Sequence, residues 1–359
     1  MRILIVKTSS LGDIIHTFPV LDYLKKWNPA CKIDWIVEKK CAELVIAHPF
    51  VHQALLIQSK RWRTQFFNGK TWREMSECLH QLHQSSYDIV FDLQGNMKSA
   101  LVTACASSQM KVGFDYRYVS EWPNLLVTNK KIHPPPGHNI REDYLYVVRS
   151  VLGDLPHSIG EGGIRLILNA EESRCLKWVV DRLKTLSGLK ILVCPGSNWV
   201  NKQLTKEALR IFLENCSRHL NAYFLLVWGD LNEKTVAEEV ALSLPDKSLV
   251  IDRLSLPALQ NLMAQVDLVI AMDSLPLHLA GTTLTPTYSV FGASSSLKYN
   301  PIGPMHKSFQ GKCPYGRIFE KRCEVLRTCT TGACIKSLNG NQLFEHFYNW
   351  WCSSSIRYS

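Results

Sequence analysis

The sequence predicts an α/β protein built from two doubly wound domains. Short runs of apolar and β-branched residues recur along the chain, and stretches with helical spacing lie between many of them. These runs form two series, separated by a segment rich in glycine. The length of 359 residues also suits two domains better than one or three.

The expected strands are short and apolar, as strands covered on both faces are. In the first series they are Arg2–Lys7, Lys32–Val37, Gln53–Ile57, Asp88–Leu93 and Lys111–Phe114, and in the second Lys190–Cys194, Ala222–Trp228, Ser248–Ile251, Asp267–Ala271 and Thr287–Phe291. Helical patterns include Glu171–Leu186, Lys206–His219 and Asn232–Ser243. This alternation indicates parallel sheets with helices on both faces.

The segment from Gly153 to Gly163 contains several glycines and a proline, which makes it the best linker. We therefore expect an N-terminal domain over residues 1–160, a C-terminal domain over 161–340, and a C-terminal helix or tail over 341–359. Each domain would present the carboxyl ends of its strands to a shared central cleft.

Composition narrows the choice of function. Hydrophobic residues make up 46% of the chain and charged residues 20%, which is ordinary for a globular protein. The net charge of +10 suits a polyanion, an anionic membrane surface or a phosphorylated substrate. Nucleic acid is disfavoured, because no RNP-type aromatic motif, basic helix or zinc-finger spacing is present.

The first apolar run is broken by Lys7 and then by polar residues, unlike a signal peptide. No apolar stretch reaches the length of about 18 residues that a membrane-spanning helix needs. We therefore expect a cytoplasmic protein.

Seven of the twelve cysteines, from Cys31 to Cys216, fall mostly in apolar or helical stretches and are expected to be reduced core residues. The other five crowd the C-terminal region: Cys313, Cys323, Cys329, Cys334 and Cys352. Their spacing lacks the close pairs of a typical zinc site. Free thiols are the expectation there, with a structural metal or a disulfide as the alternatives.

The most informative segment is the polar turn after the first strand, which ends at Asp13 where a helical pattern begins. Such a turn lies at the carboxyl end of a strand, where ligands bind in open α/β sheets. A carboxylate there can act as a general base. The alternative is a helix cap, because Ser and Asp are common capping residues.

Three polar loops follow strands of the second series. Residues 195–202 combine small, hydroxyl and amide side chains with Lys202 and could hold a diphosphate, or form a plain strand-to-helix loop. Gly229 lets a ligand approach the backbone. Asp273 and Ser274 end another strand, where Ser274 can cap the next helix. His278, one turn later, could face the same ligand or be a structural residue.

Taken together, these motifs resemble those of the bacterial lipopolysaccharide heptosyltransferase family (glycosyltransferase family 9), most closely the heptosyltransferase I type. The resemblance covers roughly residues 1–300. The segments that carry it are residues 7–19, 34–38, 61–63 and 92–99, Lys202, and residues 273–278.

The resemblance implies a GT-B fold and an inverting transfer of L-glycero-D-manno-heptose from ADP-heptose to the Kdo region of a lipid A–Kdo acceptor. It also implies peripheral contact with the cytoplasmic face of the inner membrane. No cofactor and no metal are expected, because Lys202 and a helix N-terminus would offset the charge of the leaving ADP and no DxD pair is present.

The site residues that the resemblance implies form three sets. Asp13 would be the catalytic base, with Lys202 assisting departure of ADP. The donor-binding set is Ser197, Asn198, Lys202, Gly229, Glu233, Asp273, Ser274 and His278. The acceptor-binding set is Ser10, Lys60, Arg61, Arg63, Lys98 and His138. The sequence departs from the family pattern at Leu275 and Pro276, where the family usually has a glycine after Asp-Ser/Thr.

Two alternative hypotheses for the function remain. The chain could be a related GT-B transferase that uses another nucleotide-sugar or core acceptor, or a non-catalytic GT-B protein that binds a nucleotide-sugar or a lipopolysaccharide precursor. A dinucleotide-dependent oxidoreductase is disfavoured, because G-x-G-x-x-G is missing after the first strand.

Overall fold

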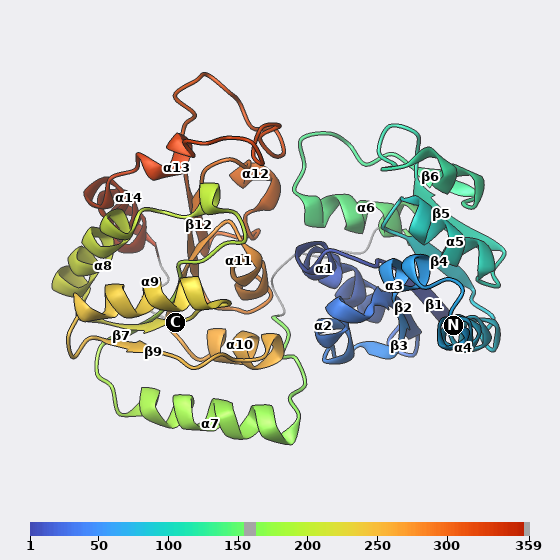
Figure 1. The fold of residues 1–359 in the computed structure, drawn as a ribbon, viewed down its shortest axis with the longest axis horizontal. Helices are drawn as coiled ribbons and strands as arrows, with labels where there is room; N and C mark the ends of the chain where they lie inside the picture. The colour runs from blue at the N-terminus through green and yellow to red at the C-terminus, as the bar shows by residue number, and fades with distance from the viewer. Residues whose placement is uncertain (154–162, 355–359) are drawn as a thin grey trace. The chain divides into compact units, whose positions relative to one another are not determined.

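A computed structural model describes residues 1–153 and 163–354. The chain divides into two compact units, Met1–Ser158 and Ile159–Ser359. Most of the expected linker, residues 154–162, lies outside the described residues. Each unit is a parallel sheet with helices packed on it (Figure 1). The α/β class with two doubly wound units is therefore confirmed.

The first unit alternates strands and helices along its whole length (Figure 1). Its elements are β1 (Arg2–Val6), α1 (Leu11–Trp27), β2 (Lys32–Glu38), η1 (Lys39–Cys41), α2 (Ala42–Ile46), β3 (Val51–Ile57), α3 (Ser59–Thr64), α4 (Gly69–His83), β4 (Ile89–Asp92), α5 (Met97–Cys105), β5 (Met110–Phe114), η2 (Trp122–Leu126), β6 (Lys130–Ile132) and α6 (Ile140–Leu152).

The second unit repeats this alternation and ends in a helix that packs against α8. Its elements are α7 (Ala170–Lys184), β7 (Leu189–Cys194), η3 (Val200–Lys202), α8 (Lys206–Leu220), β8 (Ala222–Leu226), α9 (Leu231–Leu242), β9 (Ser248–Val250), α10 (Leu256–Met263), β10 (Leu268–Met272), α11 (Leu275–Ala280), β11 (Thr287–Phe291), α12 (Ser296–Tyr299), β12 (His306–Gln310), α13 (Ala333–Lys336) and α14 (Gly340–Ser353).

Both sheets have the same strand order. It is β3-β2-β1-β4-β5-β6 in the first unit and β9-β8-β7-β10-β11-β12 in the second, with every pair parallel. The order reverses between β1 and β4, and again between β7 and β10. The loops that leave these strand pairs therefore run to opposite faces of the sheet, and doubly wound sheets bind their ligands at such reversals of strand order.

All ten expected strands are present, and their ends differ from the expected ones by at most two residues. Strands β6 and β12, which each lie at one edge of a sheet, were not predicted from the sequence. Lys130 and Lys131 of β6 are exposed, and β12 is half-buried throughout. The strands at the opposite edges, β3 and β9, were predicted, whereas β6 (KKI) and β12 (HKSFQ) consist largely of polar and charged residues and lack the apolar run by which the other strands were recognised.

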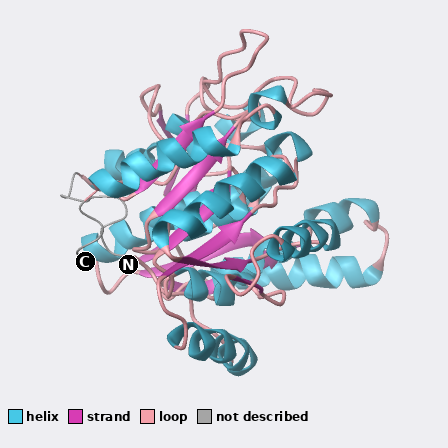
Figure 2. Cartoon of the chain, turned by 90° about the vertical axis from the view of Figure 1, so that its left-hand side faces the viewer, coloured by secondary structure: helices cyan, strands magenta, loops and turns pink. Residues whose placement is uncertain are grey.

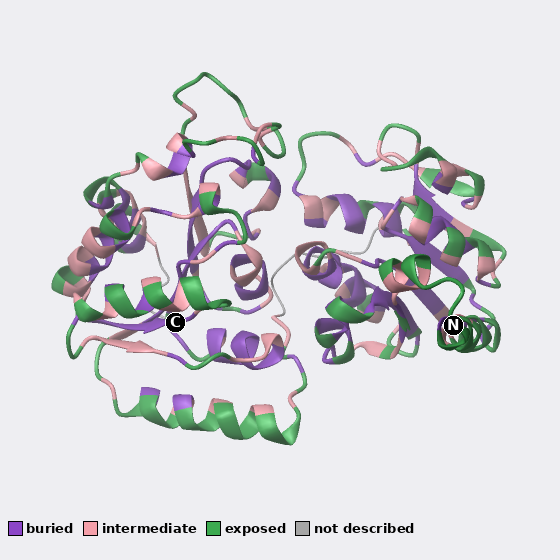
Figure 3. Cartoon of the chain, in the orientation of Figure 1, coloured by how far each residue is buried: buried purple, intermediate pink, exposed green. Residues whose placement is uncertain are grey.

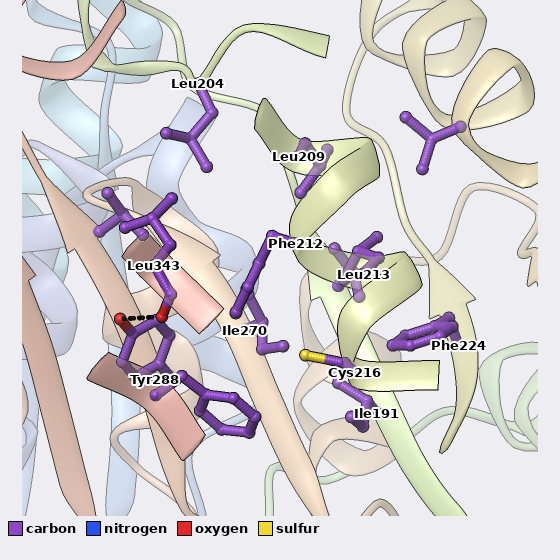
Figure 4. Packing of buried hydrophobic residues seen from close by; sticks show 14 of the residues in the cluster. Ile191, Leu204, Leu209, Phe212, Leu213, Cys216, Phe224, Ile270, Tyr288 and Leu343 are labelled. Carbon is purple, nitrogen blue, oxygen red and sulfur yellow. Dashed lines mark hydrogen bonds between the residues drawn. The ribbon is translucent and has the colours of Figure 1, made fainter. Parts of the chain in front are cut away.

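The core of the second unit shows how helices close one face of its sheet (Figures 2 and 4). Phe212 of α8, Tyr288 of β11 and Phe347 of α14 are fully buried. The ring centroid of Phe347 lies 5.1 Å from that of Tyr288 and 5.7 Å from that of Phe212. The Tyr288 hydroxyl donates to the backbone oxygen of Leu343, at 3.2 Å, so α14 is bound to the sheet by both packing and a hydrogen bond.

Candidate active site

The turn after β1 holds Asp13 in the first turn of α1. The backbone N–H and the hydroxyl of Ser10 both donate to Asp13 Oδ2, at 3.0 and 2.8 Å. The structure therefore shows a capping role for Asp13. The same bonds hold its carboxylate just beyond the carboxyl end of the central strand β1. This is the position at which a general base was considered on the basis of the sequence. The bonds also bring Ser10, an expected acceptor residue, against it.

Residues that follow β4, the strand beside β1 where the strand order reverses, hold the turn after β1 in place. Gln94 Oε1 accepts from the backbone N–H groups of Thr8 and Ser9, at 3.0 and 3.1 Å. The buried Lys7 ammonium donates to Leu93 O and to the Tyr144 hydroxyl, both at 2.9 Å. Burial lowers the pKa of Lys7, against the opposing effect of nearby carboxylates. Neither Lys7 nor Gln94 was predicted from the sequence to have a role, although both lie in the segments that resemble the family.

Two of the expected acceptor residues are already paired with carboxylates. Lys98 Nζ lies 3.0 Å from Glu38 Oε1 at the end of β2, and Ser59 at the start of α3 donates to the same oxygen. Arg61 lies 3.2 Å from Glu74. Glu38 therefore links α3 to α5, which brings Lys98 to the helix that carries Arg61. Neither ion pair was foreseen, because the partners are far apart in sequence.

The remaining acceptor candidates are solvent-facing. Lys60 and Arg63 are exposed on α3. His138 is exposed too, with Nδ1 at 3.8 Å from Glu142, and it precedes α6. It follows β6, at the opposite edge of the sheet from β3, the strand before α3.

In the second unit an ion pair joins the loops that leave β7 and β10. Lys202 Nζ and Asp273 Oδ2 are 2.5 Å apart, and both residues are buried. His278 Nε2 lies 4.0 Å from the other carboxylate oxygen of Asp273. Burial alone would raise the pKa of Asp273, but the nearby Lys202 and His278 charges outweigh it and hold that pKa below its usual value.

The loops after β7 and β8 meet through Glu233 and two glycines. Glu233 Oε2 accepts from the backbone N–H of Gly229, at 2.7 Å. A Cβ on Gly196 would lie only 2.1 Å from the Glu233 carboxyl carbon, so a side chain at this position would have to displace the Glu233 carboxylate. Nearby, the Gln203 amide donates to the Ser197 backbone oxygen, at 2.7 Å, and closes the turn. The structure thus brings Ser197, Gly229 and Glu233 to one edge of the sheet, with Asn198 exposed in the same loop.

Two expectations about this unit, the helix cap at Ser274 and the burial of Cys175, need correction. Ser274 is at the N-cap position of α11, but its hydroxyl donates to the Met272 backbone oxygen instead of accepting from the helix. Pro276 in the first turn of α11 has no N–H to offer an anion. In addition, Cys175, expected in the core, is exposed on α7.

The C-terminal cysteines form a cluster beside the β7 loop. Cys313, Cys323, Cys329 and Cys334 line one small cavity, and all four are free thiols. Within the described residues, no three His, Cys, Asp or Glu side chains are arranged to hold a metal ion. The Asn201 amide donates to the backbone oxygens of Leu326 and Cys329, at 3.1 and 2.6 Å. The cysteine-bearing segment therefore packs directly on the loop that carries Lys202.

Two parallel six-stranded sheets of this order, each with polar side chains at the carboxyl ends of its central strands, have the architecture of the GT-B fold, which many glycosyltransferases share. The sequence profile of "Glycosyltransferase family 9 (heptosyltransferase)" matches residues 75–327. The chain belongs to this family and is a glycosyltransferase.

Sequence relatives extend over most of the chain. Lipopolysaccharide heptosyltransferase 1 of Pseudomonas aeruginosa is 29% identical and spans 90% of this chain and 87% of its own. The protein of the same name from Escherichia coli K12 is 26% identical, and the match spans 81% of this chain and 88% of that protein.

Solved structures share the fold at lower identity. E. coli heptosyltransferase WaaC with ADP has a TM-score of 0.76 at 22% identity, covering 98% of this chain and 100% of that one. A glycosyltransferase family 9 protein from Veillonella parvula has a TM-score of 0.78 at 17% identity, covering 98% of each chain.

Proposed function

We propose that this enzyme transfers L-glycero-D-manno-heptose from ADP-heptose to the Kdo region of the lipopolysaccharide inner core, with inversion at the anomeric carbon. The observation that carries the proposal is the pair of polar strand-end sites: Asp13 in one unit, and Lys202, Asp273 and Glu233 in the other. The names of the sequence relatives support the choice of heptose and of a lipopolysaccharide acceptor.

In the proposed mechanism, the Asp13 carboxylate takes the proton of the acceptor hydroxyl. The hydroxyl oxygen then attacks the anomeric carbon from the face opposite ADP, the bond from that carbon to the β-phosphate oxygen breaks, and the configuration inverts. The hydrogen bonds from Ser10 support this role, because they hold the carboxylate in one orientation before the acceptor arrives. The N-terminal domain, residues 1–160, would bind the acceptor.

The C-terminal domain, residues 161–340, would bind the donor. Glu233 would accept hydrogen bonds from the ribose, while Ser197, Asn198 and the glycine backbone line the phosphates. Lys202 would offset negative charge that grows on the departing ADP. The buried Asp273 supports this role indirectly, because it holds the ammonium of Lys202 in place. Ser274 and His278 would complete the nucleotide site.

The acceptor is a lipid-anchored anion, so we infer that the enzyme works at the cytoplasmic face of the inner membrane as a peripheral protein. Lys60, Arg61, Arg63, Lys98 and His138 would attract the carboxylates of Kdo. Among the described residues, no helix is long and apolar enough to cross a membrane.

Two alternatives belong with this proposal. Pro276 and Leu275 alter the first turn of α11, which favours a different nucleotide-sugar or core acceptor if that turn contacts the donor. A non-catalytic binding protein is the second alternative, and retention of Asp13 and Lys202 speaks against it.

The test is a donor screen by mass spectrometry, with purified Kdo-lipid A as the acceptor and ADP-heptose among other nucleotide-sugars. We expect a mass gain of one heptose from ADP-heptose. Transfer of another sugar would identify the first alternative. Binding of donor without transfer or hydrolysis would identify the second.

A further inference from the structure

The connection between α3 and α4 exposes large aromatic side chains. Phe67 is 98% exposed, Trp72 49% and Phe66 43%. Most residues of helices α3 and α4 around them are exposed or half-buried (Figure 3). We call Phe66, Phe67 and Trp72 the α3–α4 aromatic patch. The Phe66 ring centroid lies 5.7 Å from that of Phe67 and 4.7 Å from that of Trp72, so the three rings form one continuous surface. Grouped exposed aromatics mark an interaction site, whereas single exposed apolar residues do not.

The patch sits on an ordered base. Trp62 of α3 packs against the core of the first unit, and its indole N–H donates to Glu74 Oε2, at 3.4 Å. Asn68 caps α4 by accepting from the Lys70 N–H, at 2.9 Å. Thr71, in the first turn of α4, is fully buried. The backbone that carries the three rings is therefore fixed on both sides, and their exposure is a property of the fold.

Basic residues surround the patch. Residues 59–73 contain Lys60, Arg61, Arg63, Lys70 and Arg73, and no acidic residue. Arg61 and Arg73 are offset by Glu74 and Glu77, at 3.2 and 2.9 Å. Lys60, Arg63 and Lys70 are exposed and form no ion pair with any residue that the structure describes. The rim of the patch therefore keeps a positive charge that faces solvent.

We propose that the α3–α4 aromatic patch docks this enzyme on an anionic lipid bilayer. Phe67 and its two neighbours would enter the boundary between headgroups and acyl chains, while Lys60, Arg63 and Lys70 contact anionic headgroups. The combination of aromatic and basic side chains favours this occupant, because aromatic rings settle at the membrane interface and basic residues are attracted to its negative potential.

The location of the patch fits a lipid-linked acceptor. Helix α3 begins just after β3 ends, and Asp13 follows β1 in the same parallel sheet. Both therefore lie at the carboxyl edge of the first unit. In this respect the inference rests on the proposed function, since docking through this edge would present the headgroup of a lipid acceptor to the side that carries Asp13.

The test measures binding of the full-length chain to vesicles, without donor or acceptor. Sedimentation is compared for phosphatidylcholine vesicles and for vesicles that also contain phosphatidylglycerol. We expect binding only to the anionic vesicles. Phe67→Ser should weaken it about tenfold, as expected for one aromatic ring withdrawn from an apolar phase. Lys70→Gln should weaken it about fivefold and reduce its sensitivity to salt.

Two control variants match these changes. Trp178→Ser removes an aromatic side chain that is 59% exposed on α7, and Lys130→Gln removes an exposed lysine at the edge strand β6. Both should bind vesicles as the wild type does. Because Phe67 is almost fully exposed, Phe67→Ser should fold normally, and an unchanged melting temperature verifies this.

The inference is overturned if the wild-type protein binds neither kind of vesicle or binds both kinds equally. It is overturned as well if Phe67→Ser binds anionic vesicles as tightly as the wild type does. It is also overturned if light scattering shows that the wild-type protein is a dimer and that Phe67→Ser is a monomer. That result would assign the patch to contact with a second copy of the chain. Transfer to a deacylated, water-soluble acceptor should be normal in Phe67→Ser. Transfer to this soluble acceptor does not require binding to a bilayer. Its absence in the wild-type protein would therefore count against the proposed function, whereas loss of vesicle binding alone would count against the docking inference.

Discussion

Lys202 and Asp273 form a buried ion pair, 2.5 Å between Nζ and Oδ2, that joins the loops leaving the two central strands of the second sheet. The residues are 71 positions apart in sequence. The pair lies where the strand order reverses, which is where a doubly wound sheet binds its ligand. The Lys202 charge is therefore already partly balanced within the protein, and Asp273 determines where the ammonium that we propose for donor binding is held.

The first prediction concerns this pair. Asp273→Asn should destabilise the fold by about 3–5 kcal/mol, because it leaves a buried ammonium without its partner. The double variant Lys202→Met with Asp273→Asn should be more stable than Asp273→Asn alone. Chemical denaturation of the three proteins measures this. Equal stability of the single and double variants would contradict the expected cost of a buried ammonium without its partner.

The pH dependence of the pair follows from the pKa of Asp273, which is held below its usual value of 3.8 by Lys202 and His278 in spite of burial. A lowered pKa in the folded state stabilises the fold above the unfolded pKa and loses that contribution as pH falls through the folded value. The difference in stability between wild type and the double variant should therefore persist at neutral pH and shrink below about pH 4.

The second prediction separates the capping and catalytic roles of Asp13. Asp13→Asn keeps an oxygen that can accept from the Ser10 N–H but removes the basicity, so turnover should fall by roughly 10²–10⁴ with little change in melting temperature. Donor affinity should hardly change. Ser10→Ala removes one hydrogen bond to the carboxylate and serves as the stability comparison. Near-normal turnover of Asp13→Asn would leave only the capping role.

The third prediction concerns acceptor recruitment by α3. Arg63 is exposed, whereas Arg61 is partly balanced by Glu74. Arg63→Gln should therefore raise the acceptor KM more than Arg61→Gln does, and leave ADP binding unchanged. The effect should weaken with salt, because exposed charges act over about 10 Å at 0.1 M ionic strength. An equal loss of donor and acceptor affinity would contradict recruitment.

The fourth prediction uses the contact between Gly196 and Glu233. Gly196→Ala places a Cβ 2.1 Å from the Glu233 carboxyl carbon and must displace that side chain from Gly229. If Glu233 binds the ribose, ADP affinity should fall about 10-fold or more, as expected for losing a charged hydrogen bond. Gly69→Ala is the control, because a Cβ at that position would have no neighbouring atom within 4 Å. Calorimetric titration with ADP measures the affinity of both variants, and Gly69→Ala should bind ADP as the wild type does.

The fifth prediction concerns the cysteine cluster. Hydrogen bonds from Gly332 and Thr331 lower the pKa of the Cys329 thiol, whereas burial raises the pKa of Cys334 to about 11. Because the thiolate is the reactive form, Cys329 should be alkylated by iodoacetamide at a lower pH than Cys334. Peptide mass spectrometry across a pH series measures both rates. Faster reaction at Cys334 would contradict this order.

The sequence by itself determined the fold class and the strand-end loops. Buried central strands such as β1 are continuous apolar runs, and a small polar turn followed by a helical pattern identifies a strand's carboxyl end without any tertiary information. Asp13, Lys202 and Asp273 were located this way, since each follows such a run closely in the chain.

Only the tertiary structure decided which charges meet. The edge strands β6 and β12 form because a neighbouring strand offers hydrogen bonds, and their polar side chains carry no apolar signal. In the same way, Lys98 pairs with Glu38, Lys202 with Asp273, and Asn201 with the segment that carries Cys329. These contacts join residues far apart in the chain, so they exist only once parallel strands bring the loops to one edge of the sheet.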